Sequence, residues 1–116
     1  MASEKIPAPL TFRAESAEAA AAASIAALEE AILRIGADQV LAFVMEPIGG
    51  QASGVNVPPA SFARGVRRVC DRYGVRLVFD EIVTAFRTGR FFAAHHDPEV
   101  RPDARNAVTT RPLRRR

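Results

Sequence analysis

The chain has 116 residues, of which 48% are apolar and 25% are charged, a composition typical of one globular domain and not of a disordered or fibrous polymer. Its formal net charge is +3, but six of its 16 basic side chains lie in residues 101–116, so the rest of the chain is slightly acidic. A nucleic-acid-binding domain needs its positive charge on the folded body. The charge distribution therefore argues against a nucleic-acid partner.

No segment of the sequence has the pattern of a secretion signal or a membrane span. The N-terminus lacks a positively charged start followed by an apolar stretch, and the alanine-rich run from Ala19 to Leu28 is too short to cross a bilayer. Cys70 is the single cysteine, so neither an internal disulfide nor a cysteine-built zinc site is available. We expect a cytoplasmic protein with no membrane contact.

In chain order, residues 1–13 carry two prolines and no periodic pattern, and they are expected to form an irregular lead-in that docks on another surface. An amphipathic helix is predicted from Ala14 to Ile35, with Gly36 as its stop. Its apolar residues recur at helical spacing at Ile25, Leu28, Ile32 and Ile35.

The middle of the chain reads as strand, loop, helix and strand. The apolar run from Val40 to Met45 predicts a strand covered on both faces, and a glycine-rich loop follows it. After Pro58-Pro59 a second helix is predicted to end at Gly74, and Val75 to Phe79 then forms the next strand. The apolar stripe of that helix is Phe62, Val66, Val69, Cys70 and Tyr73. The fold class is therefore α/β, with a βαβ unit in a partial parallel sheet.

Acidic residues follow both predicted strands. Glu46 comes after the first strand, and Asp80-Glu81 comes after the second. One acid at a strand end is more often a loop cap than a site, but ligands in such sheets bind at the carboxyl ends of strands, where these acids converge. A cationic partner, such as a protonated ring nitrogen, would hold a carboxylate ionised there.

Three phrases of the sequence, FVMEPIGGQASGVNVPP, RRVCDRYGVRLVFDEIVTAFRTGRFF and RPD, resemble consecutive blocks of the class-III pyridoxal-phosphate aminotransferases, of the aspartate-aminotransferase fold type. The resemblance extends from about Ile25 to Asp103, and its most specific block runs from Asp80 to Gly89. It implies a fragment of the large domain of a pyridoxal-phosphate enzyme, so we expect residues 14–103 to form part of that domain.

The resemblance also implies roles for individual residues at the cofactor. Asp80 matches the aspartate that pairs with the pyridine nitrogen and keeps it protonated, which the electron-sink chemistry of the ring requires. Ile82 matches the aliphatic residue on one ring face, and Val83 stands where some members place a polar side chain near the ring hydroxyl. Glu46 matches a glutamate that supports the aspartate and lines the substrate side. Gln51 stands where several members carry a second glutamate, which pairs with a substrate-gating arginine.

The step from Phe86 to Arg87 lacks the small residue that usually separates this pair in the family. That junction resembles the glutamate-1-semialdehyde aminomutase branch, whereas the segment from Thr88 to Phe92 resembles ordinary transaminases. Both branches stay open at this point.

The family holds its cofactor as a Schiff base on a lysine, and Lys5 is the single lysine in these 116 residues. Thr109 falls where the resemblance implies the reactive lysine, so no catalytic residue is predicted. The apolar strand that should precede the lysine is also missing, and residues 104–116 are expected to be an arginine-rich disordered tail.

Two functional hypotheses follow from the sequence. In the first, the chain is a catalytically inactive fragment of an enzyme that moves amino groups between an amino acid or amine and a 2-oxo acid. In the second, it is a non-catalytic module that binds a full-length aminotransferase as a homo- or heterodimer-like partner. We expect no metal site, because adjacent histidines such as His95 and His96 point to different sides.

Overall fold

The computed structural model describes residues 2–107, and those residues form one α/β unit with a three-stranded parallel sheet. Two long helices and a few short 3-10 turns accompany the strands. In chain order the helices and strands are α1 (Ala17–Ile35), β1 (Ala42–Met45), α2 (Ala60–Tyr73), β2 (Arg76–Asp80) and β3 (Ala104–Asn106). The predicted βαβ unit is β1, α2 and β2.

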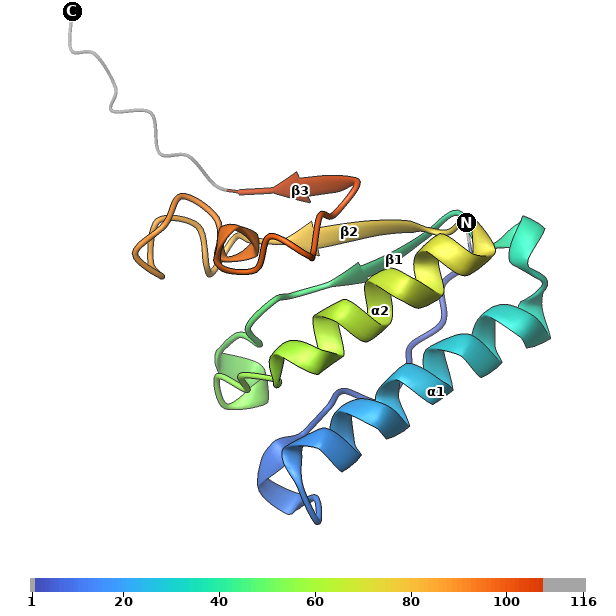
Figure 1. The fold of residues 1–116 in the computed structure, drawn as a ribbon, viewed down its shortest axis with the longest axis horizontal. Helices are drawn as coiled ribbons and strands as arrows, with labels where there is room; N and C mark the ends of the chain where they lie inside the picture. The colour runs from blue at the N-terminus through green and yellow to red at the C-terminus, as the bar shows by residue number, and fades with distance from the viewer. Residues whose placement is uncertain (1, 108–116) are drawn as a thin grey trace, which may run out of the picture.

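The sheet has the order β1, β2, β3, with β2 in the centre. Ala42 pairs with Arg76 and Met45 with Phe79 on one side of β2. Both long helices lie on the same side of the sheet, and all three strands run in one direction, so the loops after β1 and β2 leave from the same end (Figure 1).

Helix α1 begins three residues later than predicted because a capping side chain sets its start. Ser16 has extended backbone, and its hydroxyl oxygen accepts a hydrogen bond from the Ala19 N–H at 3.0 Å, as expected of an N-cap residue. Gly36 ends the helix with φ of 98°, a conformation that L side chains rarely adopt. The predicted stop is therefore confirmed.

The core lies between the sheet and the helices. Its largest fully buried side chains include Phe79, Leu77 and Ile32, and the predicted α2 stripe packs into the same cluster. The two helices approach closely at Gly65, where a Cβ atom would lie 2.3 Å from Cδ1 of Ile25. Glycine is thus needed at this crossing for steric reasons.

The opposite face of the sheet is open, which corrects one expectation. The first strand was expected to be covered on both faces, but Val44 is 61% exposed, because both long helices pack against the other face. Side chains alternate along a strand, so Val78 and Asp80 belong to the open face with Val44, while Leu77 and Phe79 face the helices.

The N-terminal lead-in docks on its own chain. The Ser24 hydroxyl, buried in α1, donates to the Pro7 carbonyl at 2.6 Å, and the Asn56 amide donates to the Pro9 carbonyl at 3.0 Å. Apart from a short turn at Thr11–Arg13, the segment is irregular, as predicted. It links α1 to the loop that follows β1.

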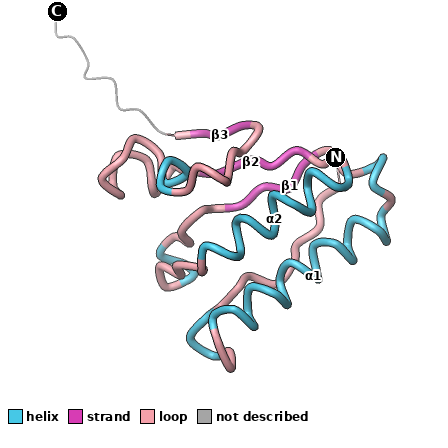
Figure 2. The backbone as a smooth tube through the Cα atoms, in the orientation of Figure 1, coloured by secondary structure: helices cyan, strands magenta, loops and turns pink. Residues whose placement is uncertain are grey.

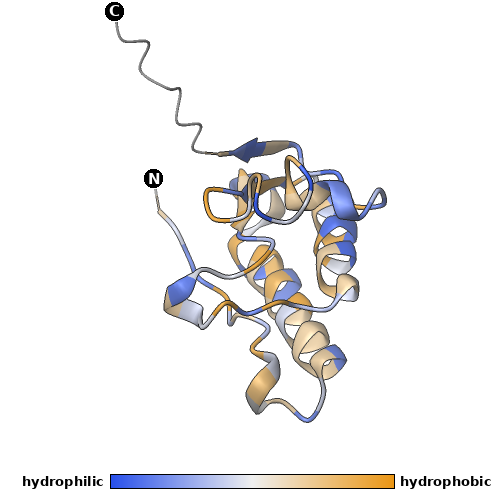
Figure 3. Ribbon diagram, turned by 90° about the vertical axis from the view of Figure 1, so that its left-hand side faces the viewer, coloured by the Kyte–Doolittle hydropathy of each residue, from blue (hydrophilic) through white to orange (hydrophobic). Residues whose placement is uncertain are grey.

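Strand β3 lies inside the region that the sequence assigned to an irregular tail. Ala104 pairs with Val78 and Asn106 with Asp80, so the tail prediction is wrong for residues 104–106. The loop before β3 is long, with one short helical turn (Figure 2), and β3 ends in hydrophilic residues (Figure 3). Its backbone pairs with β2 although its side chains have no apolar pattern. Residues 108–116, including Thr109, lie outside the described part of the chain.

Asp103 fixes the position at which β3 begins. Its Oδ2 accepts hydrogen bonds from the Leu77 N–H at 2.7 Å and from Nη1 of Arg67 in α2 at 2.8 Å. The Arg67 guanidinium, followed by the Leu77 N–H, holds the pKa of the Asp103 carboxyl below its ordinary value. The Asp103 contacts thereby hold β3 in position against β2, whereas β1 and β2 are held by apolar packing.

Candidate functional site

The carboxyl ends of β1 and β2 bring the predicted acids to one edge of the sheet. Because Met45 pairs with Phe79, the next residues, Glu46 and Asp80, occupy equivalent places on neighbouring strands. Both follow a residue that is buried toward the helices, so by alternation both belong to the open face. Figure 1 shows the loops after these strands at the same end of the molecule.

The Asp80 carboxylate is oriented through one of its two oxygens. Oδ1 accepts a hydrogen bond from the Ile82 N–H at 3.1 Å, as in an Asx turn. Within residues 2–107, no donor contacts Oδ2 of Asp80. The group is half-buried and has one oxygen left to accept a hydrogen bond from a ligand.

Two apolar side chains, Ile82 and Val83, follow the acidic pair Asp80-Glu81. Ile82 is 46% exposed and Val83 is 39% exposed, so both offer apolar surface next to Asp80 in the chain. A Cβ atom on Gly50 would lie 3.8 Å from Cγ2 of Val83 and 3.6 Å from both carboxylate oxygens of Glu46. Gly50 thus lies close to both Val83 and Glu46, which follow neighbouring strands.

The glycine-rich loop turns tightly around the Glu46 side chain. Oε2 of Glu46 accepts a hydrogen bond from the Gly50 N–H at 2.7 Å, and the Gly50 carbonyl accepts one from the Ser53 N–H at 3.1 Å. These hydrogen bonds close a turn at Gly50 within the predicted glycine-rich loop. Gln51 is exposed. Among the described residues, no hydrogen bond joins Glu46 to Asp80.

We call the sheet edge that carries Glu46, Asp80, Ile82 and Val83 the rim. Glu81, in contrast, does not belong to it. Its side chain is 0% exposed and accepts hydrogen bonds from the Thr84 hydroxyl and from the N–H groups of Ala93 and Ala94. The sequence placed it beside Asp80 as a second acid at the sheet edge. Alternation along the chain was the signal that separates the two, because neighbouring residues at a strand end face opposite sides.

The turn after the rim holds Phe86 with φ of 63°, a left-handed conformation that is uncommon for a bulky residue. Its ring makes an edge-to-face contact with Phe91, with 4.1 Å between the centroids. Nη1 of Arg87 donates to the Val83 carbonyl at 2.9 Å. Phe86, directly before Arg87, thus has a conformation that favours glycine.

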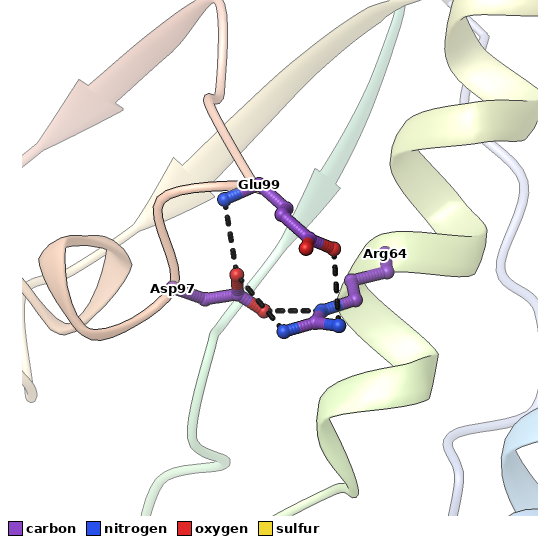
Figure 4. Close-up of polar contacts among 3 residues, drawn as sticks. All are labelled: Arg64, Asp97 and Glu99. Carbon is purple, nitrogen blue, oxygen red and sulfur yellow. Dashed lines mark hydrogen bonds and ion pairs between the residues drawn. The ribbon is translucent and has the colours of Figure 1, made fainter.

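A cluster of charges connects this segment to the start of α2. Arg64 donates from Nε to Oδ2 of Asp97 at 2.8 Å and pairs with Glu99 at 3.0 Å (Figure 4). The Arg64 guanidinium holds the pKa of the Asp97 carboxyl below its ordinary value. The cluster fixes the loop that leads toward β3.

The two adjacent histidines and Cys70 have separate surroundings. His95 contacts Nη1 of Arg105, whereas His96 contacts the Thr88 carbonyl, so the two rings have different neighbours as predicted. Burial raises the pKa of the Cys70 thiol to about 11, as expected for a residue on the predicted apolar stripe of α2. Residues 2–107 contain no group of three or more potential metal ligands, and no helix among them is long and apolar enough to cross a membrane.

A sequence model of the aminotransferase class-III family matches residues 2–106, nearly the whole chain. The chain belongs to the class-III aminotransferase family. It is 40% identical over 77 residues to the taurine–pyruvate aminotransferase of Bilophila wadsworthia, which is 66% of this chain and 16% of that protein. It is 43% identical over 67 residues to the acetylornithine aminotransferase of Methanopyrus kandleri, covering 57% and 17%.

Solved transaminase structures have the same arrangement of elements. The omega transaminase from Pseudomonas jessenii in complex with PMP matches with a TM-score of 0.74 and 33% sequence identity, over 84% of this chain and 21% of that one. The expected fold, part of the large domain of a pyridoxal-phosphate transaminase, is therefore confirmed. This class-III aminotransferase chain spans about a sixth of the length of the curated relatives that it matches.

Proposed function

We propose that this chain forms one wall of a pyridoxal-phosphate site, with Asp80 as the partner of the pyridine nitrogen. The observation that carries the proposal is the Asp80 carboxylate, which has one oxygen oriented by the Ile82 N–H and the other without a donor among the described residues. A protonated ring nitrogen would supply that donor. When bound, the protonated ring withdraws electrons from the substrate bond that breaks.

The neighbouring side chains fit the same cofactor. The exposed aliphatic side chain of Ile82 offers an apolar surface for one face of a flat ring. Val83 adds apolar surface and no polar group for the ring hydroxyl. Glu46 lies across Gly50 from Val83, where its carboxylate would line the substrate side of the ring.

The reaction of the site is the transfer of an amino group between an amino acid or amine and a 2-oxo acid, as family membership supports. The covalent attachment and the proton transfer both need a lysine amine. Lys5 is the single lysine in these 116 residues and belongs to the N-terminal segment, away from Asp80 in the sequence. We therefore expect this chain, by itself, to bind the cofactor weakly and to have no turnover.

A second candidate function is a non-catalytic module that binds a full-length aminotransferase. The open sheet face, where Val44 is 61% exposed, favours it, because parallel sheets are normally covered on both faces. Co-expression with a complete class-III aminotransferase and size-exclusion chromatography tests this function. Co-migration is expected for the module, and separate elution contradicts it.

The proposed site is tested by titrating the isotope-labelled chain with pyridoxamine 5′-phosphate and following its backbone amide signals. The largest shifts are expected at Gly50, Asp80, Ile82 and Val83. Because Asp80→Asn removes the negative charge that faces the ring nitrogen, it should weaken binding about tenfold or more. Glu15→Gln is the matched control, since this exposed carboxylate lies far from the rim in the sequence.

Two results would contradict the proposal. One is an unchanged affinity in the Asp80→Asn variant, and the other is a shift pattern that avoids the rim. Lack of turnover is tested separately with pyridoxal phosphate, an amino donor and borohydride. A reduced adduct at any site other than Lys5 or the N-terminal amine contradicts the expected inactivity.

A further inference from the structure

The buried carboxylate of Glu81 lies next to the proposed ring partner and uses both of its oxygens. Oε2 accepts hydrogen bonds from the Thr84 hydroxyl at 2.6 Å and from the Ala93 N–H at 2.7 Å, and Oε1 accepts one from the Ala94 N–H at 3.1 Å. Burial of a carboxyl group is costly unless its oxygens have donors. These three donors therefore hold the side chain in one place.

The backbone of Glu81 is fixed as well. The Glu81 backbone N–H donates to Asn106, with its nitrogen 3.1 Å from the Asn106 carbonyl oxygen and 3.3 Å from Asn106 Oδ1. The Glu81 carbonyl accepts a hydrogen bond from the Ala85 N–H at 2.8 Å. One residue thus joins the end of β2 to β3, to the following turn and, through its side chain, to the short helical turn Ala93–His96.

Asp80 and Ile82 are the direct neighbours of this fixed point. Because successive side chains at a strand end face opposite sides, Glu81 held inward directs Asp80 toward the open face. The hydrogen bond from the Ile82 N–H to Oδ1 of Asp80 spans Glu81, so its length depends on the backbone conformation at residue 81.

We infer that Glu81 is a positioning residue, which orients the Asp80 carboxylate and the exposed Ile82 side chain toward a ring ligand without touching that ligand. This role rests on the proposed function of Asp80. Glu81 acts through hydrogen bonds to the loop that returns toward β3, so its removal should change the geometry of the rim and not only the stability of the fold.

The test compares Glu81→Gln and Thr84→Val with the unmodified chain in the absence of any cofactor. Glutamine at residue 81 keeps the side-chain shape but places an amide NH₂ against a backbone N–H donor. Valine at residue 84 removes the hydroxyl donor and leaves the contacts of Glu81 with the Ala93 and Ala94 N–H groups. The readouts are the ¹³C chemical shift of the Asp80 carboxyl carbon at neutral pH and the hydrogen exchange of the Ile82, Ala93 and Ala94 amides.

In Glu81→Gln we expect these amides to exchange about tenfold faster and the carboxyl ¹³C shift of Asp80 to change, with smaller changes in the same direction in Thr84→Val. If Glu81→Gln fails to fold, Thr84→Val decides the question by the same two readouts. Faster exchange at Ala93 and Ala94 with an unchanged carboxyl ¹³C shift of Asp80 and an unchanged Ile82 amide overturns the inference. Since no cofactor is present, failure of pyridoxamine phosphate to bind is a separate result that concerns the proposed function.

Discussion

The βαβ unit and the segment after it, residues 81–107, differ in the contacts that hold them. In the βαβ unit, apolar side chains such as Leu77 and Val66 pack into the core with α1. In the later segment, Ala94 and Val100 also reach this core, but three carboxylates, from Glu81, Asp97 and Asp103, make the connecting hydrogen bonds. The first kind of contact fixes the global fold, and the second kind orients a rim where a ligand can bind.

The largest expected effect comes from a cavity in the apolar region. Leu77 is 0% exposed in the central strand, so Leu77→Ala should lower the free energy of unfolding by about 2–5 kcal/mol. Leu41→Ala is the matched control, since Leu41 is 67% exposed and should cost far less. Urea denaturation measures both variants. Equal losses would mean that burial in this unit does not determine its stability.

Overpacking at the helix crossing should have the next largest effect. A Cβ atom at residue 65 would lie 2.3 Å from Cδ1 and 3.1 Å from Cγ1 of Ile25, so Gly65→Ala should destabilise the fold by about 1–3 kcal/mol. In the background of Ile25→Ala the clash is absent, and the added methyl group should then be tolerated. Thermal unfolding of the single and double variants measures the difference. A penalty that persists in the double variant would exclude a clash with Ile25 as its cause.

A smaller, pH-dependent effect is expected at Asp103. Its pKa is lower in the folded chain than its ordinary value of 3.8, so its contribution to stability is complete above that value and is lost as the pH falls through the folded pKa. Asp103→Asn should cost about 0.5–1 kcal/mol at neutral pH, because the pair with Arg67 is partly exposed.

The pH dependence of the Asp103→Asn effect tests whether the charge of Asp103 holds β3. The difference between Asp103→Asn and the unmodified chain should shrink as the pH falls below about 3.8, through the folded pKa of Asp103. Denaturation at several pH values measures it. A difference that stays constant over this range would show that the charge of Asp103 is not what holds β3.

The smallest effect should come from the exposed charge cluster. Arg64→Gln removes the partner of Asp97 and Glu99, and we expect faster hydrogen exchange of the Glu99 amide with little change in global stability. Arg68→Gln on the same helix is the control. A large loss of global stability in Arg64→Gln would mean that the cluster belongs to the folding core.

The sequence predicted the elements whose signals are periodic or steric. The apolar spacing in α2 and the glycine stops at Gly36 and Gly74 each correspond to a local physical cause, and the structure has helix ends at those residues. Both strand ends with their acids were also predicted, because an apolar run that stops at a carboxylate marks the edge of a parallel sheet.

The sequence did not predict features that depend on distant polar contacts. β3 ends in hydrophilic residues and pairs through its backbone, with Asp103 held by Arg67 across 36 positions of the chain. Alternation along the chain indicates the side to which Glu81 points but not the donors that hold it, since two of its three donors are backbone N–H groups 12 and 13 positions away. No local pattern encodes such partners.

The central claim is that the Asp80 carboxylate accepts a hydrogen bond from the protonated nitrogen of the cofactor ring. The direct measurement is the ¹⁵N chemical shift of the ring nitrogen in labelled pyridoxamine 5′-phosphate bound to the chain, at a pH where the free ring has lost its proton. We predict a protonated-ring shift with the unmodified chain and a deprotonated one with Asp80→Asn. A bound ring nitrogen that is deprotonated in both would contradict the account.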